Sequence, residues 1–135
     1  MKYPFSLDKR KIIVFVTIQG FEIEKPFKFI LDTGASKSII DETVAVSIGF
    51  DLKKLNTERL TTIGGGKNSK LLKLPKLSLF GKTAENFEVN VLEIPPQVTF
   101  FADGLIGMDF LLLFGKLTFD FEEKSIETDN KHLAG

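Results

Sequence analysis

The chain has 135 residues, of which 43% are hydrophobic and 27% charged, enough to close one core without disulfides or metals. Eighteen basic residues balance eighteen acidic ones, so nothing indicates a surface for a nucleic acid or an anionic membrane. The absence of cysteine excludes thiolate metal sites and cysteine nucleophiles.

The first twenty residues carry a basic cluster, 9–11, ahead of an apolar run, 12–16. The run ends at Thr17 and no small-residue cleavage site follows, so we interpret it as a strand and not as a signal peptide. No segment approaches the about 20 apolar residues of a membrane-spanning helix. We therefore expect a cytoplasmic protein without membrane contacts.

Fourteen phenylalanines, many β-branched residues and closely spaced turn residues predict an all-β domain. The first predicted elements are strands over 11–19, 22–31 and 38–40 and a short helix over 41–48. The first two strands form a hairpin around Gly20, and the second ends at Asp32. The helix is expected to stop at Gly49.

Three consecutive glycines, 64–66, open a polar segment that predicts a hairpin with a mobile tip over 64–70. The flanking strands are expected over 60–63 and 71–74. A phosphate-binding loop is excluded because Thr61 and Asn68 stand where it needs glycine and a hydroxyl residue. A plain solvent-exposed turn is the other interpretation of the glycines.

The remaining predicted elements are strands over 77–80 and 87–94, one or two helical turns over 108–114, and a hairpin of strands 116–121 and 124–127. Two prolines, 95 and 96, are expected to end a strand in a loop. Residues 1–128 thus form one predicted domain, and residues 129–135 a frayed tail.

Asp32, Thr33 and Gly34 place a carboxylate directly after an apolar strand. Taken alone, this tripeptide is most often a turn, because all three residues favour turns. Residues 103–107 repeat the pattern of apolar strand residues that run into glycine.

These segments resemble a known family. Residues 29–36 resemble the active-site strand of the aspartic peptidases, and Leu105, Ile106 and Gly107 stand in the place of that family's second signature. The glycine-rich tip lies between them, where the family carries its flap. The resemblance covers about 11–127, most of the chain, and is closer to the bacterial retropepsin-like peptidases than to the retroviral ones.

The resemblance implies a closed, barrel-like acid-protease lobe with one or two short helices and a glycine-rich flap hairpin. Asp32 would be the catalytic residue, supported by its own loop and covered by the flap. The implied loop residues are Thr33, Gly34 and Ala35, and the implied flap residues are Ile63, Gly64, Gly65 and Gly66. The flap would close over an extended peptide.

The implied activity is that of an aspartic endopeptidase acting on a peptide or protein substrate. Because the chain holds a single Asp-Thr-Gly, two copies must pair to bring two Asp32 carboxylates together, and a homodimer is expected. Ala35 lacks the hydroxyl that pepsin-like enzymes use to stabilise the ionised pair, so activity is expected at weakly acidic pH. No cofactor or metal is expected.

The sequence also departs from the family. Retroviral members carry an acidic residue and an arginine where this chain has Ser36 and Met108, so their ion pair is missing. Tyr3 is the single tyrosine, so the flap tyrosine of pepsin-like enzymes is absent as well. Both departures leave the strength of the dimer open.

Other catalytic patterns are weaker. The one histidine, His132, lies in the predicted tail and cannot serve Ser36 or Ser38. Three further acids, Asp103, Asp109 and Asp120, match no metal-ligand spacing and are expected to cap elements or face solvent. Two alternative functions remain: a non-catalytic peptide-binding or dimerisation module, and a lobe that works only when paired with another protein.

Overall fold

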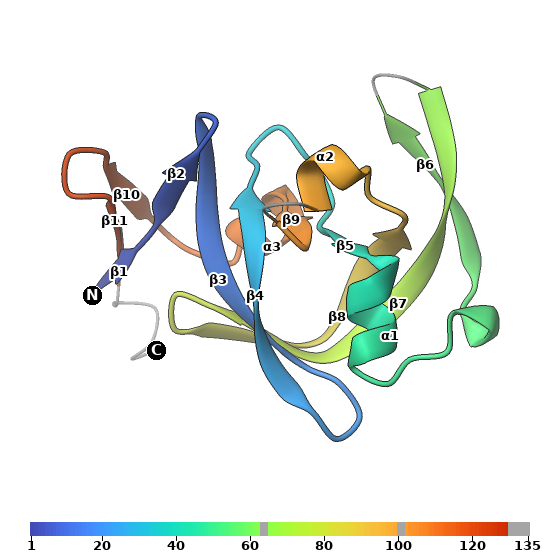
Figure 1. Cartoon of the computed structure of the whole chain (residues 1–135). Helices are drawn as coiled ribbons and strands as arrows, with labels where there is room; N and C mark the ends of the chain where they lie inside the picture. Colours follow the sequence, from blue (N-terminus) through green and yellow to red (C-terminus); the bar gives the residue numbers. More distant parts are fainter. Residues whose placement is uncertain (63–64, 100–101, 130–135) are drawn as a thin grey trace.

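Two β-sheets carry the fold of the protein, which is described here by a computed structural model covering residues 1–62, 65–99 and 102–129 (Figure 1). The strands of the larger sheet are β2 (Ser6–Asp8), β3 (Lys11–Gln19), β4 (Glu24–Leu31), β5 (Ile39–Asp41), β6 (Thr57–Thr62), β7 (Gly65–Leu79), β8 (Lys82–Leu92) and β9 (Gly104–Ile106). Their order is β2-β3-β4-β9-β5-β8-β7-β6. Because β3 also pairs with β7, hydrogen bonding runs in a ring from β3 through β4, β9, β5, β8 and β7 back to β3. The all-β prediction is confirmed.

A smaller sheet joins the two ends of the described chain. Its strands are β1 (Lys2–Pro4), β10 (Leu117–Asp120) and β11 (Ser125–Thr128), in the order β1-β11-β10. Figure 1 shows this sheet at the end of the molecule opposite β6. The hairpin of β10 and β11 was predicted, whereas β1 and β2 were not, because three residues are too short to show a period. The predicted tail lies outside the described residues except for Asp129.

The helices are short. They are α1 (Glu42–Ser47), the 3₁₀ turn η1 (Leu52–Lys54), α2 (Pro96–Thr99) and α3 (Met108–Leu111). Asp41 caps α1 by accepting a hydrogen bond from the Thr43 backbone N–H. The predicted loop at the two prolines covers only residues 93–95, because Pro96 starts α2, where its missing N–H costs nothing. None of the described helices is long and apolar enough to span a bilayer.

The core lies on the strands that lead to Asp32. On β3, Val14, Val16 and Ile18 are almost fully buried. Phe29 on β4 and Ile106 on β9 have no exposed surface and belong to the same hydrophobic cluster. Burial of a large apolar side chain stabilises a fold by about 1.5–3 kcal/mol, so these strands form a firm base for the residues that follow them.

The predicted extent of the glycine-rich tip is wrong. Residues 65–70 belong to β7 and pair with β6, from Thr62 opposite Gly65 to Thr57 opposite Lys70. Pairing gives the backbone groups that face the other arm of the hairpin their partners, which outweighs the turn preference of the glycines. Gly66 also leaves room for a neighbour, because a Cβ there would lie 2.6 Å from the Arg59 Nε. Ile63 and Gly64 lie outside the described residues.

Candidate active site

Asp32 directly follows β4 and is held by the second signature. Strand β4 pairs in parallel with β9, with Leu31 opposite Ile106. The backbone N–H of Asp32 donates to the carbonyl oxygen of Ile106 at 2.9 Å. The two segments that resemble each other in sequence therefore lie side by side, and together they position one carboxylate.

The Asp32 loop is tightly turned and open on one side. The backbone N–H of Gly34 donates to Asp32 Oδ1 at 2.9 Å, and that of Ala35 donates to the Asp32 carbonyl oxygen at 3.2 Å. Asp32 is half-buried, whereas Thr33 and Gly34 are exposed. One carboxylate oxygen is thus held by the loop itself, at the surface of the lobe.

Gly107 allows the second signature to pass beneath this loop. A Cβ at Gly107 would lie 2.7 Å from the carbonyl oxygen of Ala35 and 2.8 Å from that of Lys37. Both contacts are with backbone, which cannot move aside as a flexible side chain does. Gly104 is equally confined, because a Cβ there would collide with the Ile39 carbonyl oxygen. Close packing therefore explains both glycines.

Asp109, at the start of α3, holds the far end of the loop. Its Oδ2 accepts the Ser38 backbone N–H at 2.9 Å, and its Oδ1 accepts the Ser38 hydroxyl at 2.7 Å. The Ser38 Oγ in turn accepts the Gly107 backbone N–H at 3.0 Å. The expectation that Asp109 caps an element or faces solvent missed this contact with the loop. Its place two residues after Gly107 was the available signal.

The comparisons with known proteins agree with this geometry. A model of the aspartyl protease family matches residues 14–110. The chain belongs to the aspartyl protease family. No curated protein sequence matches it.

Two solved structures show the same retropepsin-like fold. One is a retropepsin-like aspartic protease from Rickettsia conorii, with a TM-score of 0.67 and 21% identity, covering 93% of this chain and 88% of that one. The other is the retroviral protease-like domain of Ddi1 from Leishmania major, with a TM-score of 0.57, 22% identity and 87% of each chain covered. The resemblance inferred from the sequence is confirmed at the level of family and fold.

In this aspartyl protease family member, a second polar cluster joins the Asp32 loop to the hairpin of β6 and β7. Lys37 Nζ lies 3.2 Å from Glu58 Oε1, which also accepts the side-chain N–H of Asn90 at 3.2 Å. The hydrogen bonds from Asn90 and Lys37 lower the pKa of Glu58 below its usual 4.5. No local pattern along the chain indicates this cluster, because its members lie far apart in the sequence.

The other acids considered for a metal have structural partners. Asp103 Oδ2 accepts the Lys28 backbone N–H at 3.1 Å, and Asp120 Oδ1 accepts those of Glu122 and Glu123. Within residues 1–62, 65–99 and 102–129, no three potential metal ligands come together. His132 lies outside these residues.

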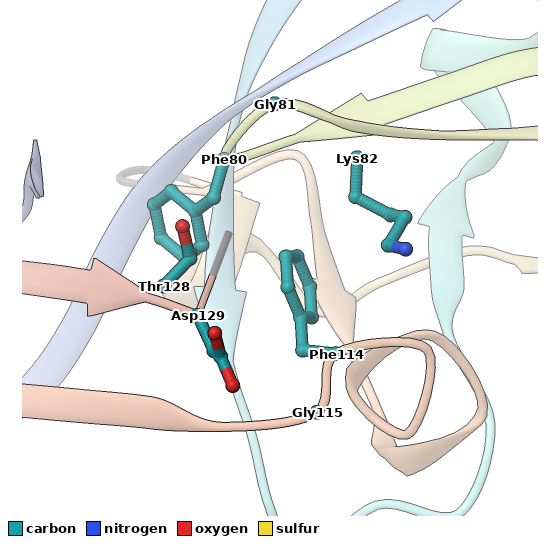
Figure 2. A pocket seen from close by; sticks show the side chains of 7 residues that line it. All are labelled: Phe80, Gly81, Lys82, Phe114, Gly115, Thr128 and Asp129. Atoms are coloured by element: carbon teal, nitrogen blue, oxygen red, sulfur yellow. The ribbon is translucent and has the colours of Figure 1, made fainter. Parts of the chain in front are cut away.

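A hollow between the turn from β7 to β8, the segment after α3 and the end of β11 does not suit a peptide. Figure 2 shows Phe80 and Phe114 in its wall, with Thr128 and Asp129 beside them. Its free volume is about 10 Å³, which is about the room that one water molecule needs. Asp32 does not line it, so we do not assign substrate binding to this hollow.

Proposed function

We propose that this protein is an aspartic endopeptidase that acts as a homodimer and hydrolyses peptide bonds with water activated between two Asp32 carboxylates. The observation that carries the proposal is the position of Asp32. Its carboxylate follows a buried strand, is held by the Gly34 N–H, and lies in a loop braced by Gly107 and Asp109.

The chemistry follows from two carboxylates in close contact. They cannot both be ionised at low cost, so they share one proton. The ionised carboxylate takes a proton from the attacking water, and the protonated one donates to the carbonyl oxygen and later to the leaving nitrogen. No covalent intermediate forms. The bond from Gly34 to Oδ1 would keep each carboxylate oriented through the cycle.

The surface around the loop supports a second copy as the partner. Thr33 and Gly34 are exposed, and the described chain contributes a single Asp-Thr-Gly. Directly after α3, which contacts the loop, Leu112 and Leu113 are 72% and 43% exposed. A two-fold axis near Thr33 would bury the same loop of each copy against the other, as an isologous interface does.

The hairpin of β6 and β7 is the proposed flap, with Ile63, Gly64, Gly65 and Gly66 at its tip. Strand β6 is an edge of the larger sheet, so it offers unpaired backbone groups to an extended peptide. The substrate we propose is therefore an extended peptide segment of a protein. No cofactor enters the reaction.

The test is digestion of a peptide library by wild type, Asp32→Asn and the surface control Asp8→Asn across about pH 3 to 7, with sizing of each protein. Acid and base roles each contribute about 10²–10⁴-fold, so Asp32→Asn should lose at least a hundredfold while Asp8→Asn stays active. Cleavage that survives in Asp32→Asn would reject the proposal. Peptide binding without cleavage by wild type would assign a non-catalytic module instead.

A further inference from the structure

We propose that Lys37 and Glu58 form a positioning pair that holds the hairpin of β6 and β7 against the Asp32 loop, with Asn90 as its anchor. The effect of this pair on substrate binding rests on the proposed function. Its effect on the position of the hairpin rests only on the contacts between the side chains.

The pair crosses from the loop to the first arm of the hairpin. Lys37 lies in the loop downstream of Asp32, and Glu58 lies on β6. Their side chains are 41% and 35% exposed, less than those of another ion pair, Lys2 and Glu123, at 61% and 67%. The Lys37 contact is also shorter, at 3.2 Å against 4.0 Å. It is therefore less screened by solvent.

Asn90 on β8 binds both sides of this junction. Its backbone N–H donates to the Ser38 carbonyl oxygen at 3.1 Å, which fixes it to the loop. Its side-chain Nδ2 donates to Glu58 Oε1 at 3.2 Å and to Ser69 Oγ at 2.8 Å, which fixes it to both arms of the hairpin. Asn90 is 1% exposed and Ser69 is 2% exposed, so the bond between them lies in a setting of low dielectric.

The pair also determines which face of the hairpin meets the loop. Glu58 and Ser69 are opposite each other in the register and share one face. The next pair on that face, toward the tip, is Leu60 and Lys67. With Glu58 held by Lys37, this face is turned toward the Asp32 loop, so Leu60 and Lys67 would be the first hairpin side chains that a substrate meets.

Loss of the pair should therefore weaken substrate binding more than it slows the chemical step. For Lys37→Met and for Glu58→Gln we expect KM to rise about threefold to tenfold, with kcat changed by less than about twofold. The exchanged pair Lys37→Glu with Glu58→Lys should recover part of the loss. The buried Asn90 Oδ1 has no partner among the described residues and can accept from the introduced lysine when the amide turns over, but that turn gives up the Nδ2 bond to Ser69, so the recovery stays incomplete.

The experiment combines peptide-cleavage kinetics with amide hydrogen exchange on the same four proteins: wild type, Lys37→Met, the exchanged double variant, and the control Lys2→Met. Amide hydrogen exchange in β6 and in the first half of β7 should be faster in Lys37→Met than in wild type. In the double variant its rate should return toward that of wild type. Lys2→Met should match wild type in both measurements.

Each arm has its own contrary result. Unchanged amide hydrogen exchange in Lys37→Met, or a double variant no better than Lys37→Met, would overturn the positioning pair. A fall in kcat with unchanged KM would overturn its role in substrate binding. If wild type cleaves no peptide, the proposed function fails, and the exchange measurement still decides whether the pair holds the hairpin.

Discussion

Replacement of Asp109 tests whether the Asp32 loop depends on a carboxylate far along the chain. Asp109→Ala removes the acceptors of the Ser38 N–H and hydroxyl, and Ser38 has no exposed surface through which water can replace them. An unsatisfied buried donor costs about 1–3 kcal/mol, and the hydroxyl keeps its bond from Gly107, so the free energy of unfolding should fall by about 2–4 kcal/mol. Peptide cleavage should fall as well, because the loop loses its far support.

Asp109→Asn is the matched variant. The amide oxygen can accept the Ser38 N–H while the amide nitrogen donates to the Ser38 Oγ, so the N–H keeps its acceptor and only the hydroxyl proton loses one. One unsatisfied donor in place of two should cost about 1–2 kcal/mol, less than the alanine variant. Urea unfolding at one fixed protein concentration, with equal slopes, measures both values. An alanine variant within about 0.5 kcal/mol of wild type, or an asparagine variant as unstable as alanine, would refute the reasoning.

Three further outcomes are expected. Gly107→Ala should destabilise the fold by about 2 kcal/mol or more in urea unfolding, because the new Cβ meets backbone at 2.7 Å, and wild-type stability would contradict the close packing. Ala35→Ser should move the pH optimum of cleavage downward by stabilising the ionised carboxylate pair, and an unchanged profile would count against that role. The pKa of Glu58 is lower in the folded chain than its usual 4.5, so the ionised carboxylate stabilises the fold above about pH 4.5. This stabilisation is lost as the pH falls through the pKa that Glu58 has in the folded chain. Glu58→Gln should flatten that part of the curve of stability against pH, and an unaltered curve would speak against the bonds from Asn90 and Lys37.

The family and the strands next to the site could be predicted because their signals are local. Long apolar segments predict β3 and β4. A capping acid predicts where α1 begins and a glycine where it ends, and the tripeptide after a strand indicates Asp32. Such patterns depend on residues within a few positions of one another.

The contacts that hold the loop could not be predicted, because they depend on tertiary pairing. Ser38 and Asp109 are 71 positions apart, and Lys37 and Glu58 are 21 apart. The glycine-rich segment was misjudged for the same reason. Gly65 and Gly66 favour a turn when taken alone, yet β6 supplies partners that keep them in a strand.

The parallel pairing of β4 with β9 has a consequence for biosynthesis. Asp32 emerges early from the ribosome, whereas the strand and the carboxylate that fix its loop, 104–106 and Asp109, follow much later. Until then the loop lacks its supports, since contacts between distant parts of a chain form after the intervening segment is available. A nascent chain of this protein should therefore carry its aspartate without a formed site, and the topology would keep incomplete chains from the proposed peptide cleavage.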